Sequence, residues 1–218
     1  MEQADRKQIW NSQILLYEML EARESRYKKQ KELIREGKGT LVCLMLNVPG
    51  PVKVTALTDW AFEQGKERIT CRLKESGITI KEEETDYKKT GYELYMIVDA
   101  DAVFVKKQLV SIEEENKLGR LFDIDVISVD GDKISRMDIC MPPRKCLLCG
   151  KTGHGCSRNR THSIEDMTAH INQIIKEEKG ERNHADSGNT RREIICEDRI
   201  LHPQCTACLL YTSDAADD

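Results

Sequence analysis

The sequence contains no run of eighteen or more apolar residues, the length that a membrane-spanning helix needs. Its first residues, MEQADRKQIW, are charged and lack the apolar segment of a signal peptide. We therefore expect neither a transmembrane helix nor secretion, and we expect the protein in the cytoplasm. No internal repeat is visible, so a repeat architecture is not expected.

An excess of one charge is also missing, because 34 Lys and Arg stand against 38 Asp and Glu, for a formal net charge of -4. This balance gives no general reason to expect binding to nucleic acid or to a membrane surface. Nine cysteines would indicate a disulfide framework in a small secreted protein. In a chain of 218 residues without an export signal, most of them are expected to be free thiols.

The periodicity of apolar residues predicts an α+β domain with a mixed, mainly antiparallel sheet and packed helices. Helices are expected at residues 12–36, 56–75, 100–107 and 162–178. Strands are expected at residues 40–48, 77–84, 92–100, 108–114, 121–129 and 134–140. Ser12 and Ser163 are the expected N-caps of the first and last helices.

The sequence becomes polar and irregular near its end. GERNHADSGNTRRE resembles a loop, and CLLYTSDAADD fits no preceding pattern. We therefore expect residues 1–180 to form the domain and residues 181–218 to be a disordered or non-native tail.

Three aspartates gather in GRLFDIDVISVDGDKISRMD, residues 119–138. Asp123 and Asp125 alternate along a predicted strand, so their side chains share a face. A turn at DGD folds the chain back, and either hairpin register places Asp138 opposite one of the pair. Such acids repel one another, and Mg²⁺ prefers carboxylate oxygens together with substrate phosphates. The pattern predicts a magnesium site for phosphoryl chemistry; a solvated strand edge is the alternative.

Three arginines, Arg120, Arg136 and Arg144, lie near these acids in the sequence. Guanidinium groups match phosphate oxygens in two-pronged fashion, which favours substrate binding. Each arginine could instead form a salt bridge with a neighbouring acid. With a two-residue turn, Arg136 would face Asp125 across the hairpin, so structural pairing competes there.

A family resemblance rests on four stretches. GRLFDIDV, ISRMDICMPPRKCLLC followed by a later cysteine and RTH, LMLNVPGPVK, and EARESR in the first helix occur in this order. They resemble the citrate lyase holo-acyl-carrier-protein synthases, also called apo-citrate lyase phosphoribosyl-dephospho-CoA transferases. The resemblance covers roughly residues 12–180.

This resemblance implies a nucleotidyltransferase-like enzyme. It would move the prosthetic group from 2'-(5''-triphosphoribosyl)-3'-dephospho-CoA to a serine of the acyl carrier (gamma) subunit of apo-citrate lyase, releasing diphosphate. Asp123 and Asp125 would bind Mg²⁺, and Asp138 would be a third ligand or the base that takes the serine proton. The implied substrate-binding residues are Arg120, Lys53, Arg144, Arg136, Asn47 and Gly50.

The segment CLLCGKTGHGCSRNRTH offers a possible structural Zn²⁺ site. Cys146, Cys149, Cys156 and His162 have the spacing C-x2-C-x6-C-x5-H, which would fill all four positions around the metal. Reduced thiols in a basic loop are the alternative. The stretch from Ile139 to Ile164 has no acid, so it could grip donor phosphates or dock an acidic carrier protein.

Two other functions stay open from the sequence. One is the related synthase for malonate decarboxylase, which performs the same chemistry on another carrier protein. The other is a zinc-knuckle binding module without catalysis, for which replacement of Asp123 would have no effect.

Overall fold

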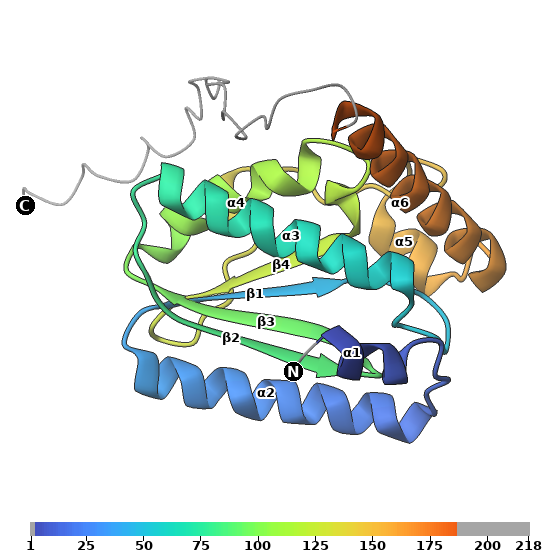
Figure 1. Cartoon of the computed structure of the whole chain (residues 1–218). Helices are drawn as coiled ribbons and strands as arrows, with labels where there is room; N and C mark the ends of the chain where they lie inside the picture. The colour runs from blue at the N-terminus through green and yellow to red at the C-terminus, as the bar shows by residue number, and fades with distance from the viewer. Residues whose placement is uncertain (1–2, 187–218) are drawn as a thin grey trace, which may run out of the picture.

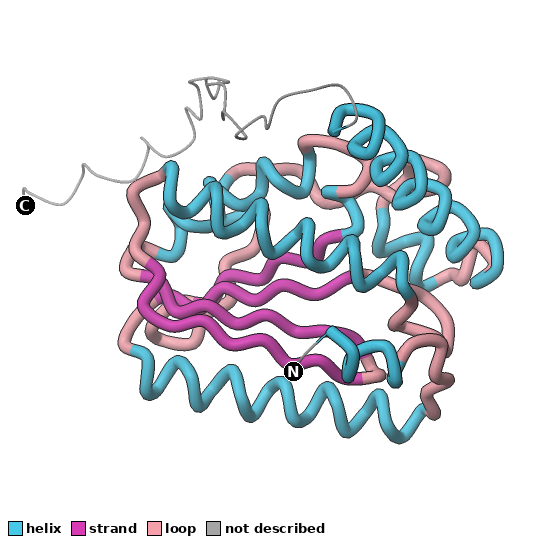
Figure 2. Tube along the Cα trace, viewed as in Figure 1, coloured by secondary structure: helices cyan, strands magenta, loops and turns pink. Residues whose placement is uncertain are grey.

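A computed structural model describes residues 3–186 of the chain, with side chains from residue 5 to residue 180. Its centre is a four-stranded sheet in the order β2-β3-β1-β4 (Figures 1 and 2). The strands are β1 (Thr40–Leu46), β2 (Ile80–Lys88), β3 (Gly91–Val98) and β4 (Phe122–Ile127). Every neighbouring pair is antiparallel. The prediction of an α+β domain with a mainly antiparallel sheet is confirmed; the likeness to nucleotidyltransferases stays a prediction.

Helices cover both faces of this sheet (Figure 1). The longer ones are α2 (Leu16–Gly37), α3 (Ala56–Glu75), α4 (Ala102–Glu114) and α6 (Ile164–Asp186). The short ones are α1 (Gln3–Arg6), α5 (Gly153–Arg158) and the 3-10 turns η1 (Lys7–Ile9), η2 (Gly119–Leu121) and η3 (Met137–Ile139). Helix α2 lies on one face, and α3, α4 and α6 lie on the other. None of the helices in residues 3–186 combines the length and apolar character needed to span a bilayer.

Strand β1 reads as a continuous apolar run, TLVCLML, because both of its faces are buried. Val42 and Leu44 join the larger core beneath α3, α4 and α6. Leu41 and Cys43 point the other way, into a smaller core beneath α2. Strand β4 lies beside β1 at the edge of the sheet, so its α2-side face is the one that can reach open space.

A glycine fixes the entry into β4. At Gly119, a Cβ atom would lie 2.1 Å from the carbonyl oxygen of Ile112 in α4. Only glycine permits this approach, and the approach brings η2 and the start of β4 against α4. The glycine of the GRLFDIDV motif therefore helps to place the acids that follow it.

Three predictions about local structure are wrong. Residues 108–114 are not a strand but the second half of α4, because Val105, Leu109 and Ile112 share one buried helical face. No return strand forms at 134–140: pairing with β4 stops after Ile134, whose N–H donates to the Val126 carbonyl. The first helix begins at Leu16 rather than after Ser12, so Ser12 is not its cap.

Other predictions of local structure are confirmed. Helix α3 has the expected bounds, and the Ser163 hydroxyl accepts a 2.9 Å hydrogen bond from the Asp166 N–H at the start of α6. Helix α6 continues to Asp186, beyond the expected end of the helix at 178 and the expected end of the domain at 180. The rest of the predicted tail, residues 187–218, lies outside the described part of the chain.

Candidate active site

Asp123 and Asp125 lie on one face of β4, as predicted. Phe122, Ile124 and Val126 alternate with them and are buried on the opposite face. The two acids pair in register with Met45 and Cys43 of β1, so they point to the side of the sheet that α2 covers. The buried apolar side chains on one face of β4 therefore fix the position of the two acids on its other face.

The two carboxylates disturb each other. Burial raises the pKa of Asp123, and the charge of Asp125 raises it further, while Arg144 and Lys133 lower it. Asp125 is more enclosed than Asp123 and accepts a 2.8 Å salt bridge from the Lys133 ammonium. The site thus holds two carboxylates close together, and Lys133 and Arg144 neutralise their negative charge only in part.

Asp138 does not lie on a strand opposite the pair, because the expected hairpin is not formed. It sits in η3 and is exposed, and its carboxylate accepts 2.7 Å hydrogen bonds from the N–H and hydroxyl of Ser135. These bonds stabilise the charged form and lower the pKa of Asp138. The geometric reason for grouping Asp138 with Asp123 and Asp125 is therefore wrong.

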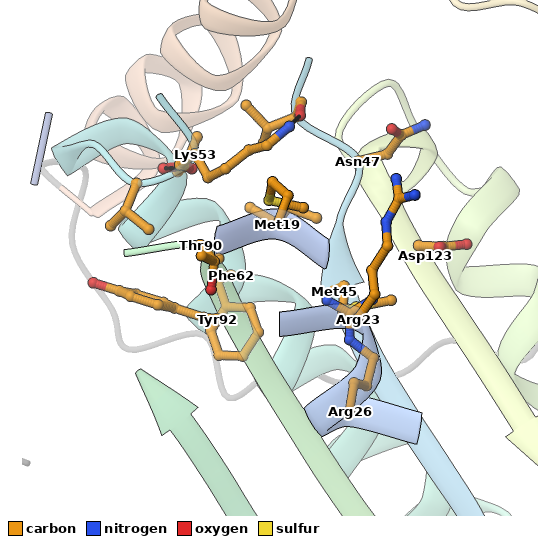
Figure 3. Close-up of a pocket in the computed structure, with 15 residues that line it drawn as sticks. Met19, Arg23, Arg26, Met45, Asn47, Lys53, Phe62, Thr90, Tyr92 and Asp123 are labelled. Atoms are coloured by element: carbon orange, nitrogen blue, oxygen red, sulfur yellow. Dashed lines mark hydrogen bonds between the residues drawn. The ribbon is translucent and has the colours of Figure 1, made fainter. Parts of the chain in front are cut away.

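A pocket of about 200 Å³ opens beside Asp123, at the end of the sheet where β1 finishes (Figure 3). It lies between α2, the turn after β1, the start of α3 and the turn between β2 and β3. Its lining residues are Met19, Arg23, Arg26, Met45, Leu46, Asn47, Val48, Lys53, Val54, Thr58, Phe62, Thr90, Gly91, Tyr92 and Asp123. Three predicted site residues that are distant in sequence, Asn47, Lys53 and Asp123, thus share one cavity.

Two cations give the pocket its character. Figure 3 shows the Arg23 side chain extending toward Asn47 and Asp123. Among residues 5–180, no carboxylate forms a salt bridge with Arg23 or Lys53. Lys53 donates to the Val48 carbonyl at 2.5 Å; burial lowers its pKa, and the positive charge of Arg23 lowers it further. A bound anion would relieve this repulsion between the two cations.

Arg26 has a different role. Its guanidinium donates through Nε and Nη2 to the buried carboxylate of Glu93, at 2.7 and 2.6 Å. Glu93 also accepts a 2.6 Å hydrogen bond from the Tyr95 hydroxyl. Arg26 is therefore a fixed part of the wall that fastens α2 to β3.

The three arginines predicted to bind substrate are engaged elsewhere. Arg136 and Arg144 both pair with Glu113, a fully buried acid of α4, and Arg144 comes within 3.8 Å of Asp123. Arg120 is exposed and donates to the Lys145 carbonyl at 2.7 Å. None of the three lines the pocket.

Asn47 and Gly50, both in the turn NVPGPVK after β1, have different roles. Asn47 lines the pocket, and its N–H donates to the Leu121 carbonyl at 3.0 Å. Gly50 has the positive φ of 78° that only glycine adopts easily. A Cβ atom there would lie 2.8 Å from Ile164, so this glycine serves the packing of the turn against α6.

Arg23 and Arg26 were not assigned as site residues from the sequence, although both belong to EARESR. Their spacing of three places them on one side of a helix. Two arginines repeated on one helix face, within a stretch that resembles the family, were the available signal. What the sequence could not show is that this face meets the turn after β1.

The predicted zinc ligands come together in a second place. One ligand atom from each of Cys146, Cys149, Cys156 and His162 lies within 4.8 Å of the others. The Cys149 and Cys156 sulfurs are 3.4 Å apart, and His162 Nε2 lies 3.4 Å from the Cys149 sulfur. This cluster is the only group of three or more such ligands found in the described residues.

Comparison with known proteins identifies the family of this chain. The family model described as apo-citrate lyase phosphoribosyl-dephospho-CoA transferase matches residues 14–178, which include the pocket, the acid pair and the cysteine cluster.

Relatives from several bacteria match about three quarters of this chain. A Vibrio cholerae protein named as a probable apo-citrate lyase phosphoribosyl-dephospho-CoA transferase is 35% identical over 162 residues, or 74% of this chain and 91% of its own. A Citrobacter koseri protein with the same name, without "probable", is 30% identical over 158 residues, or 72% and 86%. The Haemophilus influenzae protein named CitXG is 35% identical over 165 residues, or 76% of this chain, but this match spans only 36% of that longer relative. The chain belongs to the apo-citrate lyase phosphoribosyl-dephospho-CoA transferase family.

Proposed function

We propose that this chain transfers the phosphoribosyl-dephospho-CoA group from 2'-(5''-triphosphoribosyl)-3'-dephospho-CoA to a serine of the acyl carrier protein of apo-citrate lyase. A bond forms between the serine oxygen and the phosphorus nearest the ribose, and the bond from that phosphorus to diphosphate breaks. The serine loses its proton, and diphosphate leaves. The proposal rests on the family and on one observation: Asp123 shares a pocket with Arg23 and Lys53, which lack acidic partners in residues 5–180.

The charge of the pocket suits a triphosphate. Arg23 offers a guanidinium that can grip phosphate oxygens, and Lys53 offers a point charge whose pKa an anion would restore. Asn47 adds an amide that can donate to oxygen. Among residues 5–180, no acid forms a salt bridge with either cation, so phosphate oxygens can take up these donors.

The size of the pocket limits what it holds. Pockets that enclose a drug-sized ligand usually measure about 300–1,000 Å³, and this one measures about 200 Å³. It can take the triphosphate, while the dephospho-CoA moiety would extend along the outside. An open reaction centre also suits a second substrate that is itself a protein.

The acid pair fits Mg²⁺. Asp123 and Asp125 supply two carboxylates on one face, and no third acid joins them among the described residues. Mg²⁺ is often held by one or two carboxylates with water and substrate phosphates in the other positions. We propose Asp123 and Asp125 as its ligands, with Lys133 yielding Asp125 when the ion binds. The chemistry expected of the ion is neutralisation of charge on the phosphate oxygens.

Asp138 is a poor candidate for the base that takes the serine proton. The Ser135 hydrogen bonds lower its pKa and hold its carboxylate in η3. The carrier protein supplies the nucleophile, so this chain needs no nucleophile of its own. We also propose the cytoplasm as the site of the reaction, because clustered thiols such as Cys149 and Cys156 survive in a reducing compartment.

The test is transfer to purified apo-carrier protein, followed by intact mass. We expect a mass gain matching phosphoribosyl-dephospho-CoA on the carrier protein of citrate lyase and little on that of malonate decarboxylase. Asp123→Asn should reduce the rate by about 100-fold or more, with unchanged thermal unfolding. Asp130→Asn, in the exposed turn after β4, is the matched control and should keep full activity.

Three results would each count against part of the proposal. Absence of any mass gain with the wild-type chain would reject the transferase. Full activity of Asp123→Asn would reject the acid pair as the reaction centre. Preference for the malonate decarboxylase carrier would move the function to the related synthase.

A further inference from the structure

We propose that Cys146, Cys149, Cys156 and His162 bind one structural Zn²⁺ ion that fixes the loop carrying Arg144. A tetrahedral site with Zn–S bonds of about 2.3 Å and a Zn–N bond of about 2.0 Å needs sulfurs about 3.8 Å apart and nitrogen about 3.5 Å from sulfur. The two separations at Cys149 are 3.4 Å, and all four ligand atoms lie within 4.8 Å. Small adjustments of side chains would complete the tetrahedron.

The backbone around the first two cysteines already has the form of a metal knuckle. The Cys146 N–H donates to the Lys151 carbonyl at 2.5 Å, and the Gly150 N–H donates to the Cys146 carbonyl at 3.2 Å. Gly150 follows with a φ of 70°, which turns the chain back toward Cys146. An isolated β-bridge between Lys145 and Thr152 closes the turn. These backbone contacts hold the turn between the first two cysteines in one conformation.

The other two ligands come from separate elements. Cys156 lies in α5, and His162 lies in the loop just before α6. A shared ion would therefore tie the knuckle, the short helix and the start of α6 into one unit. With four protein ligands no position remains for substrate, which is the arrangement of a structural rather than a catalytic zinc.

The segment has little else to hold it together. Between residues 140 and 163, only Cys146 and Cys156 are buried, and Leu147 is half-buried against the main core. A chain segment that buries so few apolar side chains recovers little of its lost conformational entropy through burial. A zinc ion commonly supplies that free energy in small loop-rich units.

The charge of the segment also favours thiolate ligands. It contains no acid, and it carries Arg144, Lys145, Lys151, Arg158 and Arg160. Three thiolates around Zn²⁺ leave one negative charge, which these cations offset. Reduced thiols without a metal would leave the convergence of four ligand side chains unexplained.

The cluster connects to the proposed reaction centre through backbone contacts. The Arg144 carbonyl accepts a 2.9 Å hydrogen bond from Gly153, and the Lys145 carbonyl accepts one from Arg120 at 2.7 Å. The Arg144 guanidinium reaches Glu113 and lies 3.8 Å from Asp123. We infer that the ion positions Arg144 beside the acid pair; this last step rests on the proposed function.

The experiment measures metal in the full chain, purified without a histidine tag from zinc-supplemented cells. We expect about one zinc ion per chain, released together with three reactive thiols when a strong chelator is added. Cys149→Ser and His162→Asn should each lose most of the zinc and melt at a lower temperature. Cys140→Ser, an exposed cysteine outside the cluster, should keep both. Refilling the stripped protein with Co²⁺ should give the visible bands of a tetrahedral thiolate site.

These measurements distinguish failure of the zinc site from failure of the proposed transferase function. A wild-type chain that holds less than about a tenth of an equivalent of zinc, or whose intact mass shows a Cys149–Cys156 disulfide, would overturn the zinc site. Zinc retained in both variants would overturn it as well. Zinc present without transfer activity would reject the proposed function and leave the zinc site standing. If zinc is present, its removal should lower kcat, because Arg144 would no longer be held beside Asp123; an unchanged kcat would reject the positioning of Arg144.

Discussion

Two pairs of cations flank the acids of β4, and they are built differently. On the pocket side, Arg23 and Lys53 have no carboxylate partner in residues 5–180, and their charges oppose each other. On the other side, Arg136 and Arg144 converge on the buried carboxylate of Glu113. Both pairs lie close to acids, yet only the first pair retains charge to offer a ligand.

The difference teaches how to separate binding arginines from structural ones. Glu113 also accepts a 3.3 Å hydrogen bond from the Ile124 N–H, so it joins α4 to β4 as well as to the loop after η3. An arginine that is needed to neutralise a buried acid cannot easily leave it, because an unpaired buried charge is very costly. Two cations without carboxylate partners in one pocket repel each other and lower the stability of the fold, but they leave a site for an anion.

The largest expected effect is the loss of the buried acid. Glu113→Gln should lower the free energy of unfolding by about 3–5 kcal/mol, because it leaves Arg136 without its buried partner. Chemical denaturation would measure this. The adjacent Glu114→Gln is the control: Glu114 also bonds Arg136, at 2.6 Å, but it is exposed. Its replacement should cost less than about 1 kcal/mol, and equal losses in the two variants would remove the contrast between the regions.

On the pocket side, we expect a smaller effect, and we expect it on donor binding rather than on stability. Arg23→Met should weaken donor binding by about 1.5–3 kcal/mol, the usual contribution of a hydrogen bond to a charged group, or about 10- to 100-fold in KM. Its unfolding free energy should change by no more than about 0.5 kcal/mol, because Arg23 is exposed. Transfer kinetics and denaturation would be measured side by side.

Arg35→Met, at the far end of the same helix, gives the matched control for Arg23. Arg35 is exposed, and its one salt bridge within residues 5–180 is with the neighbouring Glu36. It should change neither KM nor stability. A normal KM in Arg23→Met would place the phosphate site elsewhere and leave Arg23 as an ordinary surface residue.

Much of the fold could be predicted because its signals are local. The apolar run of β1, the period of α3 and the Ser163 cap each depend on a few adjacent residues. The strand predicted at 108–114 failed because a short apolar run fits either element, and burial against η2 and β4 selects the helix. The return strand failed because Asp138 uses its carboxylate to close a local turn with Ser135.

The candidate site could be predicted only in part, for a related reason. Alternation along β4 places Asp123 and Asp125 on one face, and the cysteine spacing anticipates the metal cluster. Pairing between distant residues has no local signal. Glu113, Arg136 and Arg144 meet only after α4 packs on β4, and Arg23 comes near Lys53 only after α2 packs on the face of the sheet.

The smallest expected effect concerns the titration of the acid pair, which lies between the two regions. Burial is the first cause that raises the pKa of Asp123, and the charge of Asp125 is the second. Asp125→Asn removes the second cause and releases Lys133, so the pKa of Asp123 should fall while staying above the usual value. When folding raises the pKa of a carboxyl, its contribution to stability is fully present at a pH below its pKa in the unfolded chain. That contribution is lost as the pH rises through its pKa in the folded protein. Between these two pKa values, Asp125→Asn should therefore lose less stability with rising pH than the wild-type chain.

NMR titration of the Asp123 carboxyl carbon would check this shift directly. Asp130→Asn, in the exposed turn, is the control and should leave the Asp123 titration unchanged. The shift should be modest, because Asp123 is only half-buried and solvent screens the two charges. An unchanged pKa in Asp125→Asn would show that the two carboxylates do not interact. They would then be too far apart to share one magnesium ion, and the pocket cations would remain as the only support for a phosphate site at β4.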